Sequence, residues 1–134
     1  MALVEWNETL NIGVPEIDYQ HRNLVSMLNA LAKAIEEGTT DTVLREILDE
    51  LNAYILTHFA AEERIMERIG YQYMSEHQVE HHRLAETAQR YRDAFARGVT
   101  PAQEILAFMI RWLLNHIAGA DSHIGVAYRA ASNH

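Results

Sequence analysis

Residues 44–69 read LREILDELNAYILTHFAAEERIMERI, and apolar side chains recur in this stretch every three or four positions. Such spacing places them on one stripe of an α-helix that faces a protein core. His58 and Glu62 occupy two positions of the same stripe. Burying ionisable groups is costly unless something holds them together, and a bound metal ion is one solution. The stretch therefore predicts a long helix that carries two candidate metal ligands.

Three further stretches carry apolar stripes of the same kind, and histidine interrupts each of them. The interruptions are His21 in residues 21–35, His77 and His81 in residues 74–95, and His116 in residues 102–116. A lone histidine on an apolar stripe is usually a hydrogen-bonded core residue. Several histidines on the stripes of four helices require a shared explanation.

Glycines and capping residues predict where these helices begin and end. Gly38, Gly70 and Gly98 each follow a helical stretch, as is typical of a left-handed C-terminal residue. Asp18 is a candidate N-cap of the first helix. The sequence Thr100-Pro101-Ala102-Gln103 predicts a capping box, with proline at the first helical position of the fourth.

Four helices with short connections predict an all-α fold, an antiparallel up-down-up-down four-helix bundle. The length of 134 residues fits a single domain, residues 1–134. Within it we expect an N-terminal arm over residues 1–17, the bundle over 18–121 and a C-terminal tail over 122–134, which includes a short helix.

This topology gathers the polar residues of the stripes. In an antiparallel bundle, the first and third helices begin at the end where the second and fourth finish. His21, His77 and His81 lie near the start of their helices, and the other stripe ligands lie toward the finish of theirs. All of them are therefore expected at one end of the bundle, which favours a metal site over separate core histidines.

The spacing of the ligands supports a shared centre. His58 with Glu62, and His77 with His81, are four residues apart and so lie one above the other on a helix face. Asp121 follows His116 by five residues, a step that turns it about 140° away in a regular helix. For Asp121 to join the site the helix must bulge or end, which Gly119 makes easier. Periodicity alone leaves this ligand open.

Five imidazoles and two carboxylates are too many for one zinc ion, which takes four ligands, and so indicate two metals. If both carboxylates bridge and one oxo or hydroxo group is shared, the set fills about 11 of the roughly 12 positions of two six-coordinate metals. One open position on a redox metal suits a small ligand such as dioxygen. The many nitrogen ligands also differ from the carboxylate-rich ferritin-like sites, which favours reversible binding over substrate oxidation.

Composition excludes several other classes. There is no cysteine, so disulfides, thiolate metal sites and cysteine nucleophiles are ruled out. The net charge of -8, with basic residues scattered among acidic ones, argues against nucleic acid as a partner. No apolar run is long enough to suggest membrane insertion, and residues 1–6 do not resemble a signal peptide. We therefore expect a cytoplasmic protein.

Taken together, the motifs resemble those of the bacterial hemerythrins, over residues from about 6 to 121. The matching motifs are Gly13-Val14-Pro15, Ile17-Asp18-Tyr19-Gln20-His21, His58-Phe59-Ala60-Ala61-Glu62-Glu63, His77 with His81, and Trp112-Leu113-Leu114-Asn115-His116-Ile117 with Asp121.

The resemblance implies a non-haem di-iron centre with an oxo or hydroxo bridge. It implies that His77, His81 and His116 bind one iron and that His21 and His58 bind the other. Glu62 and Asp121 would bridge the two irons, and dioxygen would bind at the iron with two histidines. Residues near these ligands are expected to form the oxygen pocket: Leu24, Phe59, Trp112, Leu113 and Ile117.

We therefore expect an oxygen carrier, store or supply rather than an enzyme. Two alternatives stay open: a di-iron enzyme that acts on peroxide or nitric oxide, and a module that senses oxygen, redox state or iron or that sequesters iron. An oxygen-consuming protein partner is possible but unidentified. Off the stripes, His82, His123 and Glu63 are expected on solvated surfaces.

Overall fold

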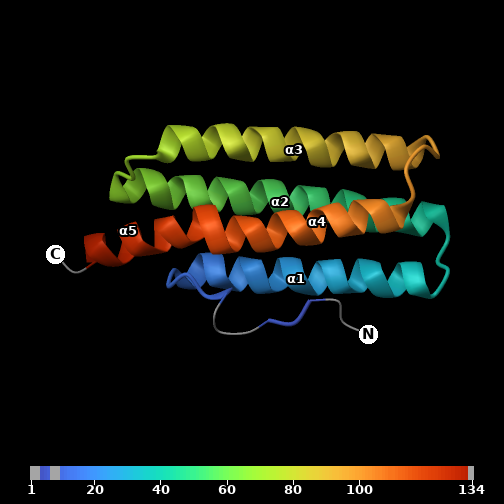
Figure 1. The fold of residues 1–134 in the computed structure, drawn as a ribbon, viewed down its shortest axis with the longest axis horizontal. Helices are drawn as coiled ribbons and strands as arrows, with labels where there is room; N and C mark the ends of the chain where they lie inside the picture. The colour runs from blue at the N-terminus through green and yellow to red at the C-terminus, as the bar shows by residue number, and fades with distance from the viewer. Residues whose placement is uncertain (1–3, 7–9, 133–134) are drawn as a thin grey trace.

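The computed structural model describes residues 4–6 and 10–132, and every regular element in this part of the chain is helical (Figure 1). In chain order the elements are α1 (Pro15–Glu36), α2 (Asp41–Ile69), α3 (Met74–Ala96), α4 (Ala102–His116), the π-helix η2 (Ile117–Asp121) and α5 (Ser122–Ser132).

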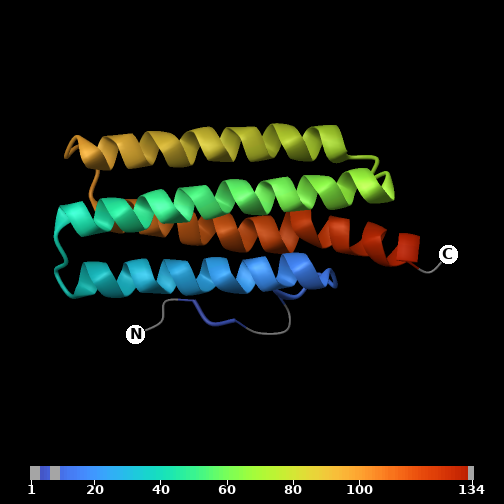
Figure 2. The same ribbon diagram turned by 180° about the vertical axis from the view of Figure 1, so that it is seen from behind.

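Helices α1 to α4 lie side by side and alternate in direction, while α4, η2 and α5 follow one another as a continuous rod (Figures 1 and 2). The predicted antiparallel four-helix bundle is thus confirmed. The short helix expected after Asp121 is α5, which projects beyond the other helices at one end.

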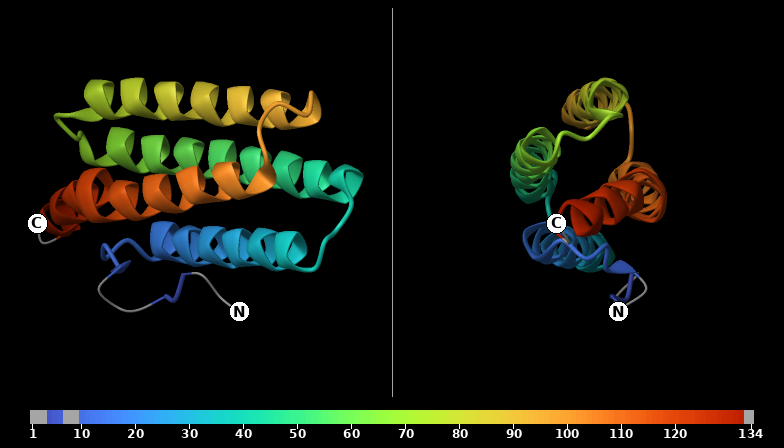
Figure 3. Two further views of the ribbon diagram at one scale, coloured as in Figure 1. Left: turned by 45° about the vertical axis from the view of Figure 1, so that its right-hand side comes forward. Right: turned by 90° about the vertical axis from the view of Figure 1, so that its left-hand side faces the viewer.

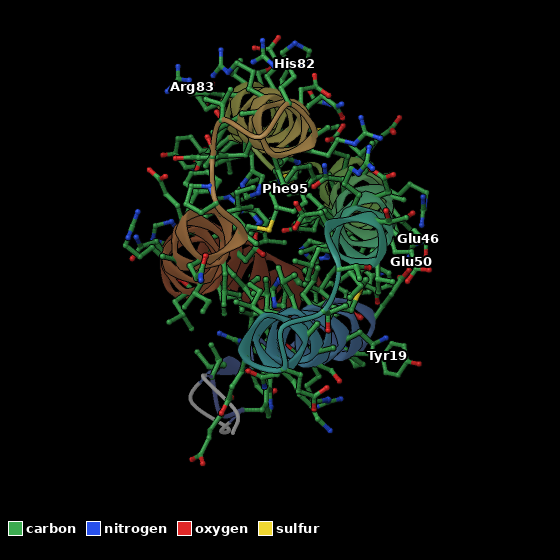
Figure 4. The ribbon with its side chains drawn as sticks, turned by 90° about the vertical axis from the view of Figure 1, so that its right-hand side faces the viewer. Tyr19, Glu46, Glu50, His82, Arg83 and Phe95 are labelled. Carbon is green, nitrogen blue, oxygen red and sulfur yellow. The ribbon has the colours of Figure 1, made fainter. Side chains whose placement is uncertain are left out.

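Each helix is amphipathic, and its apolar stripe faces the bundle axis. In the end-on view of Figure 4, Phe95 points between the helices, whereas Glu46, Glu50 and His82 project outward. The largest buried side chains include Leu31, Leu48, Leu51, Ile105 and Met109. Each such burial contributes about 1.5–3 kcal/mol, so the stripes account for most of the packing energy of the fold.

The predicted C-terminal glycines are confirmed: Gly38, Gly70 and Gly98 have φ of 71°, 65° and 74°. The predicted N-cap of α1 is wrong, because the helix begins at Pro15 with Val14 as its N-cap. Asp18 is instead buried in the first turn.

The carboxylate of Asp18 accepts hydrogen bonds from the backbone N–H groups of Ile12 (2.7 Å) and Gly13 (3.2 Å). It therefore ties the arm to the helix rather than capping it. Further along the arm, the side chain of Asn29 on α1 pairs with both backbone groups of Val4, at 3.1 and 2.8 Å. These bonds fix the arm alongside α1 (Figure 1).

The predicted capping box of α4 is also wrong. Pro101, with extended backbone angles, is the N-cap residue, and α4 begins at Ala102 without a side-chain cap. Because proline occupies the cap position itself, the hydroxyl of Thr100 lies one residue too early to cap.

No helix within residues 4–6 and 10–132 has the length and hydropathy that a membrane span requires.

Candidate metal centre

One end of the bundle holds all seven residues that the sequence proposed as ligands (Figure 3, right, shows this end facing the viewer). They come from four bundle helices and the π-helix, and each is at most 5% exposed. The residues are His21 on α1, His58 and Glu62 on α2, His77 and His81 on α3, His116 on α4, and Asp121 at the end of η2.

The π-helix brings Asp121 back to the face of His116. A π-turn has more residues per turn than an α-turn, so a five-residue step keeps both side chains on one side of the rod. Their closest atoms, His116 Nε2 and Asp121 Oδ2, are 3.0 Å apart. The predicted break in the helix is therefore present. The backbone of Gly119 stays outside the left-handed region, so its extra conformational freedom is not used.

The seven side chains form two overlapping groups that share both carboxylates. His21 and His58 make one group with Glu62 and Asp121, and within each group the potential ligand atoms lie within 4.8 Å of one another. The other group adds to the same carboxylates His77, His81 and His116. Two groups with common carboxylates are what a pair of bridged metals would need.

The ring nitrogens of the first group crowd around the carboxylates. His21 Nε2 lies 2.7 Å from Asp121 Oδ2 and 3.1 Å from His58 Nε2, while His58 Nε2 lies 2.8 Å from Glu62 Oε1. In the second group, His116 Nε2 is 3.1 Å from Glu62 Oε1. His77 Nε2 is 3.3 Å from Asp121 Oδ1. All five Nε2 atoms thus face the two carboxylates.

Several of these atoms make no hydrogen bond of acceptable geometry although they are fully buried. They include Glu62 Oε2, Asp121 Oδ1, His77 Nε2 and His81 Nε2. Buried polar atoms are nearly always satisfied, and an exception calls for an explanation such as an ion. Nitrogen and carboxylate donors that converge without partners fit a metal pair, and their N/O chemistry suits iron.

When no metal is present, electrostatic attraction between the two carboxylates and the histidines stabilises the cluster. Burial alone would lower the pKa of His77 and of His116, but Asp121 and Glu62 outweigh it and raise these pKa values to about 9 and about 10. The pKa of His58 is raised by the same carboxylates against the effect of burial. Conversely, burial would raise the pKa of Glu62, yet its hydrogen bond with Asp121 and the nearby His58 and His116 hold this pKa well below its usual range. Burial and the charge of Glu62 would raise the pKa of Asp121, but His116 outweighs them and lowers it.

Comparison with known families agrees with this arrangement. The family described as Hemerythrin, the Hemerythrin HHE cation binding domain, matches residues 12–127. The chain belongs to the hemerythrin family.

Individual hemerythrins are similar along nearly the whole chain. The bacteriohemerythrin of Stenotrophomonas maltophilia is 38% identical over 121 residues, which cover 90% of this chain and 78% of the relative. That of Methylococcus capsulatus is 30% identical over 129 residues, 93% of this chain and 96% of the relative. A crystal structure of wild-type hemerythrin superimposes with a TM-score of 0.87 at 29% identity, covering 95% of this chain and 98% of the other.

Residues that support the ligands of this hemerythrin were missed at the sequence level. The Nδ1 atom of His81 lies 3.0 Å from a carboxylate oxygen of Glu63, and that of His58 lies 2.8 Å from the amide oxygen of Gln20. The expectation of a solvated Glu63 is wrong, since its side chain is only 32% exposed and is bound to a ligand. Its position directly after Glu62 on α2 was the available signal, because the adjacent position also faces α3.

The five residues proposed for an oxygen pocket surround the ligands unequally. Phe59 stacks on the ring of His81, with centroids 3.9 Å apart and planes at 7°. Trp112 stacks on His116 at 5.3 Å and 20°. The aromatic pair therefore covers histidines of the three-histidine group. Leu24, Leu113 and Ile117 are fully buried, whereas Trp112 is half-buried.

His82 and His123 lie on the surface as expected.

Proposed function

We propose that this protein binds dioxygen reversibly at a di-iron centre and serves as an oxygen carrier, store or supply in the cytoplasm, rather than as an enzyme. The observation that carries the proposal is the pair of donor groups that share Glu62 and Asp121. When bound there, two irons would supply the electrons that reversible oxygen binding requires.

The histidines divide unequally between the two metal positions. His77, His81 and His116 would hold one iron, and His21 and His58 the other, with both carboxylates as bridges. Three neutral imidazoles and two shared carboxylates would leave fewer open positions on the first iron than two imidazoles and the same carboxylates would leave on the second. The position beside His21 and His58 is therefore where we expect dioxygen to enter.

The surrounding apolar side chains would exclude water from that position. Leu24 follows His21 by three residues on α1, and Leu113 precedes His116 by three on α4; both are at most 1% exposed. Together with Ile117, they would form the wall of the oxygen pocket at this position, and Phe59 and Trp112, which stack on His81 and His116, would close the pocket on the side of the three-histidine group. A dry wall would slow irreversible oxidation of the irons, since loss of the oxygen in a reduced form needs protons from water.

The proposal is tested on iron-loaded protein, by visible spectra through repeated cycles of air and argon. A band that appears in air, disappears under argon and returns over several cycles supports an oxygen carrier. The same samples are assayed with hydrogen peroxide or nitric oxide and a reductant. Sustained turnover of either compound, without a reversible oxygen band, would replace the carrier with an enzyme.

A further inference from the structure

Two ligand histidines in this site have partners of different charge. Glu63, which accepts from Nδ1–H of His81, is a carboxylate, whereas Gln20, which accepts from Nδ1–H of His58, is a neutral amide. His81 belongs to the three-histidine group and His58 to the two-histidine group. We propose that Glu63 and Gln20 are positioning residues that make the two metal positions electronically unequal.

The chemistry of the partners fixes the tautomer of each ring. A carboxylate or an amide oxygen can only accept, so the Nδ1 atoms of His81 and His58 must carry the hydrogen. The Nε2 atoms, which face Glu62 and Asp121, are then free to bind metal in the neutral rings. An acceptor behind a ligand histidine also raises its basicity, and a charged acceptor does so more strongly than a neutral one.

The geometry around Glu63 holds this acceptor in place. Gln78 on α3 donates to one oxygen of Glu63 at 3.2 Å, which leaves the other oxygen 3.0 Å from His81. Gln78 and His81 are on the first turns of α3, whereas Glu63 is on α2. The carboxylate is thus held by two side chains of the neighbouring helix, while Phe59 stacks on the face of the His81 ring.

The difference between the two metal positions matches the roles proposed for them above, with dioxygen bound only at the position beside His21 and His58. In this respect the inference rests on the proposed function. The charged partner strengthens electron donation at the position with three histidines. The neutral partner leaves weaker donation at the position where dioxygen is expected. The pair would then hold the oxygen-binding metal less firmly and the other metal more firmly.

Zinc provides a test that does not depend on oxygen chemistry. Affinities for two zinc ions are measured by competition with a chelator for wild type, Glu63→Gln and Gln20→Glu. Glutamine can keep the hydrogen bond to His81 while removing its charge. Loss of a partner behind a metal ligand typically costs 10–100-fold in affinity. Because Glu63→Gln removes the charge but keeps the bond, we expect it to weaken one zinc site by the lower end of this range, about tenfold, and Gln20→Glu to strengthen the other.

Glu67→Gln is the matched control, since Glu67 is an exposed carboxylate one turn further along α2. It removes the same charge from the same helix without touching a ligand. Equal loss of zinc affinity in Glu63→Gln and Glu67→Gln would overturn the proposal, because the loss would then come from the overall electrostatic field of the protein. Unchanged zinc affinities in both Glu63→Gln and Gln20→Glu would overturn it as well.

A spectroscopic measurement separates the charge effect from a loss of structure. In the zinc-loaded protein, the Nδ1–H proton of His81 is expected downfield in the NMR spectrum and should move upfield in Glu63→Gln, while the Nδ1–H proton of His58 keeps its shift. Gln20→Glu should instead move the His58 proton downfield. Failure of the iron protein to bind oxygen reversibly, with these zinc results intact, would remove the proposed function and leave the unequal positions standing.

Discussion

At the scale of single residues, protons occupy the place that a metal would take. Glu62 and Asp121 raise the pKa of His77 to about 9 and that of His116 to about 10, so both rings are cationic at neutral pH in the metal-free protein. Metal ions bind neutral imidazole. Metal uptake must therefore release protons, and metal affinity should increase with pH.

The same groups predict how the stability of the metal-free protein depends on pH. A raised histidine pKa stabilises the fold fully below its unfolded value of 6.5, and this contribution is lost as pH rises through about 9 to 10. The depressed pKa values of Glu62 and Asp121 stabilise the fold above about pH 4.5, and that contribution is lost as pH falls.

We therefore expect maximal stability of the metal-free protein between about pH 4.5 and 6.5, with a loss on the order of a few kcal/mol by pH 10. Urea unfolding across this range measures it. His82→Gln is the control, because His82 is exposed. A flat profile from pH 6 to 10 would contradict the assignment of cationic His77 and His116.

A second prediction at this scale concerns the wall of the oxygen pocket. Leu113→Ser should admit water beside the ligands and speed irreversible oxidation of the oxygenated iron protein about tenfold, a barrier change of about 1.4 kcal/mol. The decay of the oxygenated visible band in air measures this rate.

Leu106→Ser serves as the control, since Leu106 is also buried on α4 but lies about two turns before Leu113. Both substitutions should reduce the free energy of unfolding by about 2–5 kcal/mol. Equal oxidation rates for the two variants would remove Leu113 from the pocket.

At the scale of elements, the rod formed by α4, η2 and α5 has two separate roles. Its π-turn returns Asp121 to the metal site. Beyond that turn, α5 packs against the N-terminal arm: Arg129 donates to the backbone oxygen of Ile12 at 2.6 Å. Gly125 permits the close approach, because a Cβ atom there would overlap the same oxygen.

Gly125→Ala should therefore push the arm away from α5 and lower the free energy of unfolding by about 1–3 kcal/mol, the usual cost of overpacking. Gly119→Ala is the matched control: its Cβ atom would meet nothing within 4 Å, and its backbone stays outside the left-handed region. Alanine there should be neutral or stabilise by about 0.5–1 kcal/mol. Thermal and urea unfolding of both variants measure the difference, and similar stabilities would contradict tight packing at Gly125.

At the scale of the whole molecule, the metal site joins segments that are far apart in the chain. Its candidate ligands come from α1, α2, α3, α4 and η2, and they lie buried at the end of the bundle where α1 and α3 begin and α2 and α4 finish. A ligand that binds only the folded chain raises the free energy of unfolding by an amount that grows with the logarithm of the ligand's excess over Kd.

Metal should therefore raise the melting temperature of the protein. At 100 times Kd, each site adds about 2.7 kcal/mol to the free energy of unfolding. His21→Ala removes a ligand of the two-histidine group alone, so it should reduce metal content from two ions per chain to one and keep part of the thermal shift. Calorimetric melting together with elemental analysis measures both. Two ions retained in His21→Ala would contradict the division into two groups.

The sequence predicted most of the fold because its signals are local and repeated. A stripe that runs from Leu44 to Ile69 with steps of three and four residues is typical of one buried helix face, and Gly38, Gly70 and Gly98 end helices at positions with positive φ. The errors lie at helix starts. Asp18 was predicted as a cap from its residue type, but Val14 before Pro15 is the N-cap of α1. Thr100 was predicted as a cap from its spacing to Gln103, but Pro101 itself is the N-cap of α4.

The sequence by itself determined that the polar residues of the stripes meet at one end, since helix direction and periodicity settle which face and which end each side chain occupies. It could not determine the π-turn that places Asp121 beside His116, nor which of Glu63 and Gln20 touches which histidine. Only the tertiary structure decided these, because a contact between neighbouring helices depends on their relative rotation and spacing. The periodicity of a single helix carries no information about either.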